Sequence, residues 1–137
     1  MTLERFVKAQ ENSYETALKE IQCGRKRSHW MWYIFPQMKG LGYSSTAQYY
    51  AIQSRKEAEA YLKHPILSKR LIEISETLLE CESSSASKIF GYPDDMKLKS
   101  SMTLFALVSD NKIFKDVLNK FFAGEMDRKT IQLLNDV

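Results

Sequence analysis

Hydrophobic residues recur along most of this chain at alternating spacings of three and four, which is the repeat of an amphipathic helix. The segment from Leu3 to Cys23 shows this repeat most clearly, and its apolar stripe has one polar member, Gln10. Thr2 can cap the start of such a helix, and Gly24 can end it. No pair of alternating runs joined by a tight turn predicts a hairpin. The pattern therefore predicts a mainly α-helical protein.

Serine, proline and aspartate mark where the later helices begin. A helix is expected to start near Ser45 or Thr46 and to reach Ile52. Ser54 and Glu57 have the spacing of a capping box, so another helix is expected there. Further helix starts are predicted at Pro65, Pro93, Asp110 and Asp127. No linker or repeat divides the chain, and we expect one compact domain over residues 1–137, with about six to eight helices.

The segment from Arg25 to Gln37 concentrates the recognition chemistry of the chain. Three cations run directly into a histidine, both tryptophans, a tyrosine and a phenylalanine. Aromatic faces stack on flat heterocycles, and cations neutralise phosphate. Pro36, Gly40 and Gly42 exclude one regular helix, so we expect a short helical piece followed by a loop. This segment predicts a site for a nucleotide-like anion.

Individual roles follow from the chemistry of the side chains. Arg25 and Arg27 are expected to hold phosphate, unless they belong to a solvated loop. Either Trp30 or Trp32 is expected to stack on a base, and the alternative is that the tryptophans fill the core. The polar side chains expected to contact hydroxyls or base edges are Gln37, Gln48 and Tyr49.

The helix predicted to start at Pro93 carries the second group of candidates. Asp94 is expected to polarise a water or a ribose, and His29 to assist proton transfer. Asp95 is expected to pair with Lys99, one turn further on. The alternative for this helix start is capping and a solvated polar face. Three residues share the face expected to border a cleft, namely Asp94, Lys97 and Ser101.

Composition and charge exclude several classes of protein. The chain is 44% hydrophobic and 27% charged, as is typical of globular domains, and its net charge of +3 is weaker than that of a dedicated nucleic-acid binder. Its two cysteines form neither a zinc motif nor a disulfide framework, so no metal is expected. No signal peptide or membrane-spanning run is present, which predicts a cytoplasmic protein. Without a Walker loop or a dinucleotide fingerprint, no cofactor is expected.

Three blocks resemble the domain-of-unknown-function 1810 (DUF1810) family of bacterial proteins. They are Glu4 to Gln10, Gly24 to Trp32 with Ile34 to Gln37, and Pro93 to Phe105. The resemblance runs through nearly the whole chain. It implies a mainly helical fold and supplies no established activity.

A fainter resemblance is to the NADAR proteins, which act on substrates derived from NAD or ADP-ribose. The stretch from Ser45 to Tyr50 lies where that family has a helix start with a glutamate, which falls here on Ala47. Cleavage at the ribose C1 passes through an oxocarbenium-like state that a carboxylate stabilises. Asp94 or Asp95 would have to provide that carboxylate, or the protein only binds.

The leading hypothesis is therefore a NADAR-like helical protein that binds an ADP-ribose, NAD-like or other nucleotide ligand. If it is an enzyme, it is expected to hydrolyse an N-glycosidic bond, as an ADP-ribosyl hydrolase does. Its partner would be a nucleotide-like small molecule or an ADP-ribosylated substrate. The alternatives are a non-catalytic binding module and a nucleic-acid-associated protein that uses the basic aromatic block on a single strand.

Overall fold

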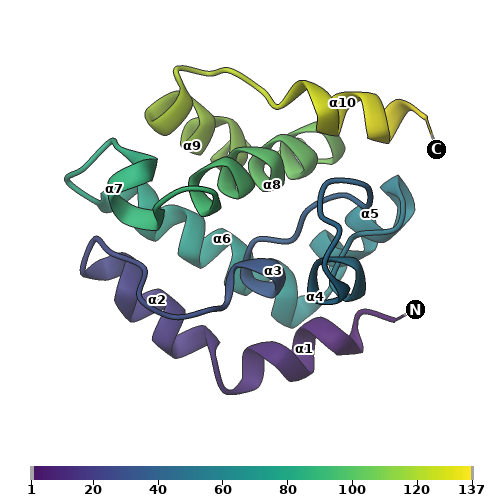
Figure 1. The fold of residues 1–137 in the computed structure, drawn as a ribbon, viewed down its shortest axis with the longest axis horizontal. Helices are drawn as coiled ribbons and strands as arrows, with labels where there is room; N and C mark the ends of the chain where they lie inside the picture. The colour runs from purple at the N-terminus through teal and green to yellow at the C-terminus, as the bar shows by residue number, and fades with distance from the viewer. Residues whose placement is uncertain (1, 137) are drawn as a thin grey trace.

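Ten helices and one isolated β-bridge form the regular structure of residues 2–136, which the computed structural model describes (Figure 1). The mainly α-helical prediction is confirmed, although the helices are more numerous than the six to eight expected. They are α1 (Glu4–Glu11), α2 (Tyr14–Gln22), α3 (Met31–Ile34), α4 (Ser45–Tyr49), α5 (Arg55–Lys63), α6 (Pro65–Glu80), α7 (Ala86–Phe90), α8 (Asp94–Val108), α9 (Ile113–Phe122) and α10 (Arg128–Asn135).

The prediction of one helix from Leu3 to Cys23 is wrong, because the chain bends between α1 and α2 (Figure 1). Asn12 and Ser13 lie at the bend, and both residue types compete with helical hydrogen bonds through their own side chains. The Tyr33 hydroxyl donates to Ser13 Oγ at 2.9 Å, which ties the bend to α3. Gly24 follows α2 with a φ of +79°, so the predicted stop is confirmed.

The predicted helix starts at Ser54, Pro65 and Asp127 are confirmed. The Ser54 hydroxyl accepts a hydrogen bond from the Glu57 N–H at 3.1 Å, and Pro65 is the first residue of α6. Asp127 accepts from the Thr130 N–H at 3.0 Å and caps α10. These motifs are local, so neighbouring sequence suffices to form them.

Four predicted helix boundaries are wrong. Thr2 does not cap α1; its carbonyl accepts from the Arg5 side chain instead. Pro93 precedes α8 instead of starting it. The helix at Ser45 ends at Tyr49, and Ile52 forms the bridge instead. Asp110 does not cap α9, because that helix starts later, where Asn111 Oδ1 accepts from the Ile113 N–H at 3.0 Å.

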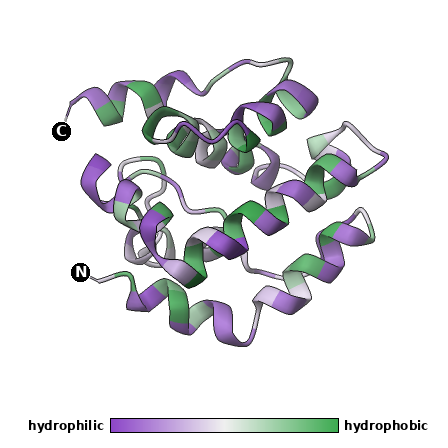
Figure 2. Ribbon diagram, turned by 180° about the vertical axis from the view of Figure 1, so that it is seen from behind, coloured by the Kyte–Doolittle hydropathy of each residue, from purple (hydrophilic) through white to green (hydrophobic). Residues whose placement is uncertain are grey.

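Helices α6 and α8 form the centre of the fold. α8 packs against α5, α7, α9 and α10, while α6 packs against α1, α2, α5 and α9. Because it has neighbours on several sides, α8 is buried almost all the way round from Ser100 to Ala106. The outer helices have hydrophobic residues along one side and hydrophilic residues along the other (Figure 2).

The segment between α3 and α5 has little regular structure, and two backbone hydrogen bonds fix it. Lys39 N–H donates to the Ile52 carbonyl at 2.9 Å, and Ile52 N–H donates to the Gln37 carbonyl at 2.8 Å. Met38 and Ile52, the bridge partners, are both buried. The chain between them, which includes α4, is thereby held as a defined surface loop.

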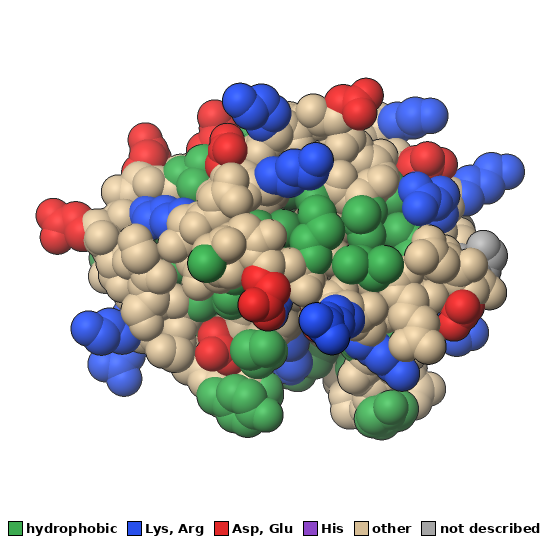
Figure 3. All heavy atoms as spheres, turned by 90° about the horizontal axis from the view of Figure 1, so that it is seen from above, with side chains coloured by type: hydrophobic (Ala, Val, Ile, Leu, Met, Phe, Trp, Pro, Cys, Tyr) green, Lys and Arg blue, Asp and Glu red, His purple; other side chains and the backbone are tan. Residues whose placement is uncertain are grey.

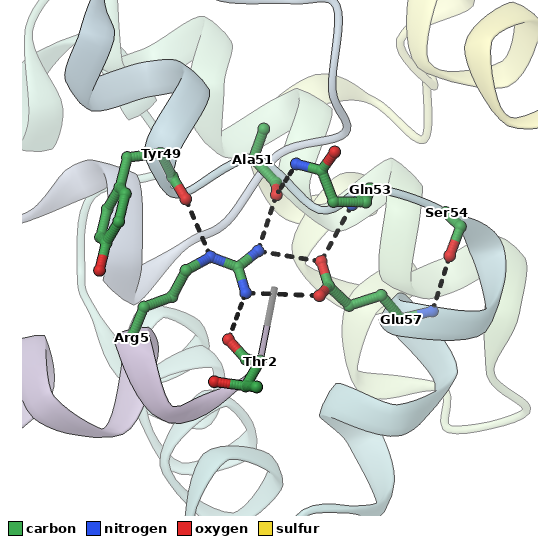
Figure 4. A network of polar contacts seen from close by, with 7 residues as sticks. All are labelled: Thr2, Arg5, Tyr49, Ala51, Gln53, Ser54 and Glu57. Atoms are coloured by element: carbon green, nitrogen blue, oxygen red, sulfur yellow. Dashed lines mark hydrogen bonds and ion pairs between the residues drawn. The ribbon is translucent and has the colours of Figure 1, made fainter.

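A buried arginine holds this loop against α1 (Figure 4). Arg5 is only 6% exposed, and its guanidinium uses all of its N–H donors. It donates to the carbonyls of Thr2, Tyr49 and Ala51, and it forms a two-pronged ion pair with Glu57, the shorter contact being 2.9 Å. The geometry of the loop therefore depends on one charged side chain.

Candidate functional site

A pocket of about 450 Å³ lies between the loop and the start of α8. Trp32 and Gln37 line it on the α3 side, and Met96 and Lys97 line it from α8. Other lining residues include Gly42, Tyr43, Ala47 and Ser100. We call this cavity the Trp32 pocket. Its size lies within the usual range for small-molecule sites.

A lysine lies over the indole ring in this pocket. The Lys97 ammonium is 5.2 Å from the centre of the Trp32 ring, and it is 3.3 Å from Asp94. Asp94 is also paired with Lys26 at 3.0 Å. The Lys26 side chain is buried, lies over the Trp30 ring and donates to the Ser28 carbonyl. Two ammonium groups therefore share one carboxylate, which leaves a net positive charge beside the pocket.

A second pocket, of about 560 Å³, adjoins the first. Lys39, Gln48, Tyr49 and Gln53 line it, and we call it the Tyr49 pocket. Gly42 and Tyr43 line both pockets and so form the partition between them. The Gln48 amide donates to the Tyr43 carbonyl at 2.8 Å, which holds this partition in place.

Neither pocket has an acidic side chain among the described residues that line it, whereas each has a lysine. The remaining lining groups are aromatic, amide, hydroxyl and aliphatic. Such walls favour a ligand that combines a flat apolar part with negative charge.

The structure brings together about half of the predicted ligand-binding residues. Trp32, Gln37 and Lys97 line the Trp32 pocket, and Gln48 and Tyr49 line the adjoining one. Asp94 reaches the site only through its ion pair with Lys97 and does not line either pocket.

The remaining predicted ligand-binding residues, and His29, which was predicted to assist proton transfer, lie elsewhere. Arg25, Arg27 and His29 are exposed on the connection between α2 and α3, and they line neither pocket. Trp30 is 1% exposed and belongs to the core. Ser101 is fully buried, and Ser100 lines the Trp32 pocket in its place. The reason is that adjacent residues on a helix point about 100° apart, and α8 is buried along the side that carries Ser101.

The predicted pair between Asp95 and Lys99 is wrong. Lys99 instead forms an ion pair at 2.7 Å with Glu125, which lies in the connection between α9 and α10. Asp95 Oδ1 accepts a hydrogen bond from the Met96 N–H at 2.8 Å. A long-range partner thus replaces the local one, and Lys99 is directed away from the pockets.

A carboxylate holds the basic aromatic segment in place. Glu20 accepts hydrogen bonds from the backbone N–H groups of Arg27 and Ser28, at 2.8 and 3.0 Å, and from the Ser28 hydroxyl at 2.6 Å. The Trp30 indole N–H donates to it at 2.9 Å. Partial burial raises the pKa of Glu20, but these hydrogen bonds outweigh it and lower the pKa from 4.5 to about 2. Trp30 is thus part of a structural network.

Replacing Glu20 with glutamine is expected to remove a pH-dependent part of the stability. Because the folded pKa is depressed, the contribution is present above pH 4.5 and is lost as the pH falls from 4.5 to about 2. Urea unfolding across this range should show the wild-type protein more stable at neutral pH, with a difference that shrinks toward pH 2. A difference that is constant over the whole range would contradict the role given to Glu20.

The sequence interpretation gave no site role to Tyr43, Met96 or Ser100, and it included Lys26 only as one cation of the basic cluster. Met96 and Ser100 share a helix face with Pro93 and Lys97, so helical periodicity could have identified them. No helical periodicity places Lys26 or Tyr43 near the pocket in the sequence, because long-range packing sets their positions.

Among residues 2–136, no group of three or more histidine, cysteine, aspartate or glutamate side chains is placed to hold a metal ion. None of the helices in this part of the chain has the length and hydrophobicity needed to cross a membrane.

The chain was compared with protein families, curated proteins and solved structures. The family described as "Protein of unknown function (DUF1810)" matches residues 1–134. The crystal structure of the conserved hypothetical protein Rv1873 from Mycobacterium tuberculosis is similar, with a TM-score of 0.95 and 48% identity over 97% of this chain and 96% of that chain. The comparison with curated proteins gave no match. The match over nearly the whole length shows that the chain belongs to the DUF1810 family.

Proposed function

We propose that the protein binds a nucleotide-type anion, such as AMP or the nucleotide part of ADP-ribose, in the Trp32 pocket. The observation that carries this proposal is the Lys97 ammonium, which lies 5.2 Å from the centre of the Trp32 ring in a pocket whose described lining residues include no acid. The indole offers a face for a base, and the ammonium group neutralises a phosphate.

Gln37 supplies the hydrogen-bonding groups that such a ligand needs. Its side chain lines the pocket and makes no hydrogen bond to another described residue, so both its amide donors and its carbonyl oxygen are available. The Lys26–Asp94–Lys97 cluster keeps one positive charge in excess at the pocket edge. The Trp32 pocket thus combines a stacking surface, a cation and a hydrogen-bonding amide in one cavity.

Binding without turnover fits this geometry better than hydrolysis. Cleavage at a ribose carbon needs a carboxylate beside it, and the described walls contain none. Asp94 is held between two lysines, and His29 is exposed outside both pockets.

The face of the molecule that lies at the top of Figure 1 does not favour strand binding. Figure 3 shows the face formed by α8, α9 and α10, where acidic and basic side chains are interspersed and hydrophobic atoms are exposed between them. A nucleic-acid footprint on that face would instead gather charges of one sign.

Replacing Lys97 with methionine is expected to weaken AMP binding by about 1.5–3 kcal/mol, because a phosphate loses its charged hydrogen-bond donor. Isothermal titration calorimetry on the folded variant measures this change. Lys99→Met is the matched control, since Lys99 lies on the same helix but pairs with Glu125, and it should leave the affinity unchanged. Equal losses in the two variants, or no AMP binding by the wild-type protein, would overturn the proposed function.

A further inference from the structure

The two adjoining pockets offer the same three kinds of side chain. Each has an aromatic ring, a primary amide and an ammonium group, and neither has an acid among its described lining residues. A ligand with two similar halves would meet similar chemistry on both sides. The corresponding groups are Trp32, Gln37 and Lys97 in the first pocket and Tyr49, Gln53 and Lys39 in the second.

Close packing and a hydrogen bond hold the partition between the pockets in place. Gly42 has no side chain, and a Cβ added there would lie 2.6 Å from the Cβ of Ala47, which requires glycine at this position. Tyr43 is 83% exposed, and its carbonyl is held by the Gln48 amide. Because Gly42 and Tyr43 line both pockets, a ligand that occupies both would pass over these two residues.

The hydrogen-bonding groups of the Tyr49 pocket fit a second ring. The Gln53 amide nitrogen donates to the Ala51 carbonyl at 3.0 Å, which orients the side chain and leaves its oxygen available to accept. Tyr49 is 52% exposed, so its ring offers free surface. The Tyr49 carbonyl accepts a hydrogen bond from the Arg5 side chain, and this contact fixes the backbone that carries the Tyr49 ring.

We propose that the ligand is a dinucleotide, with one ring system in each pocket and an anionic phosphate bridge that crosses Gly42 between Lys97 and Lys39. This inference rests on the proposed function, because it places the first base on Trp32. It adds that the Tyr49 pocket binds the second ring, so that a dinucleotide gains contacts that a mononucleotide lacks.

The test compares NAD, which has two ring systems, with AMP, which has one. Calorimetry on the wild-type protein should show tighter binding of NAD. Tyr49→Ala should weaken NAD binding by about 5- to 150-fold, the range for loss of one stacked base, and should leave AMP binding unchanged. Lys39→Met should show the same selectivity, and Lys99→Met serves as the control that changes neither affinity. Thermal unfolding of each variant confirms that it is folded.

Different results separate this inference from the proposed function. If Lys97→Met weakens the binding of both ligands while Tyr49→Ala and Lys39→Met change neither, the dinucleotide is excluded and the Trp32 pocket remains. If neither AMP nor NAD binds the wild-type protein, both proposals fail. If a short single-stranded DNA binds more tightly than NAD, with an affinity that falls steeply with salt, the ligand is a strand and the dinucleotide proposal is overturned.

Discussion

Replacing Arg5 with methionine is expected to destabilise the protein by about 3–5 kcal/mol, because it leaves the Glu57 carboxylate partly buried without its counter-ion. Three backbone carbonyls, those of Thr2, Tyr49 and Ala51, lose their donor at the same time. Urea unfolding measures the change in the free energy of unfolding. Since the Tyr49 and Ala51 carbonyls anchor the loop that carries the Tyr49 pocket, ligand binding should weaken as well.

Two further variants test the cause of this loss. Arg55→Met removes an exposed arginine whose side chain makes one hydrogen bond among the described residues, at 3.5 Å to the Leu107 carbonyl, so its effect should be within about 0.5 kcal/mol. Arg5→Met combined with Glu57→Gln should recover part of the stability, because the uncompensated charge is gone. A single Arg5→Met variant as stable as the wild type would contradict the role of this network.

Replacing each tryptophan in turn is expected to affect a different property: stability for Trp30 and ligand binding for Trp32. Trp30→Ala should cost about 3–5 kcal/mol of stability, because its ring is 1% exposed and packs against Phe35 and Phe90. Trp32→Ala should cost less stability, since this ring is half-buried, but should weaken nucleotide binding by about 1–3 kcal/mol.

Chemical unfolding and calorimetry on both variants provide the comparison. A Trp32→Ala variant that binds AMP as tightly as the wild type would show that its ring does not contact the base. A Trp30→Ala variant with unchanged stability would contradict the assignment of Trp30 to the core.

Local signals predicted the parts of the fold that depend on nearby residues. The caps at Ser54 and Asp127 and the proline that starts α6 were found because each motif spans only a few positions. The bend at Ser13 was missed, because the hydrophobic stripe continues through it and its contact with Tyr33 is distant in sequence.

The candidate site was predicted in part, for a similar reason. Side-chain chemistry identified Trp32 and Lys97, but it could not distinguish Trp32 from Trp30. The hydrogen bond to Glu20 and the packing against Phe35 and Phe90 place Trp30 in the core, and Trp32 lines the pocket. Sequence alone also could not show that Asp94 is shared by two lysines, because Lys26 approaches it from a different part of the chain.

Tryptophan fluorescence tests the central claim most directly. In a Trp30→Phe variant, Trp32 is the one remaining tryptophan, so any signal change reports on the pocket. Titration with AMP or NAD should change the emission with a saturable dependence on ligand, and Lys97→Met in the same background should shift the midpoint to higher concentration. Emission that stays constant through the titration, while circular dichroism shows the helical fold intact, would contradict nucleotide binding at Trp32.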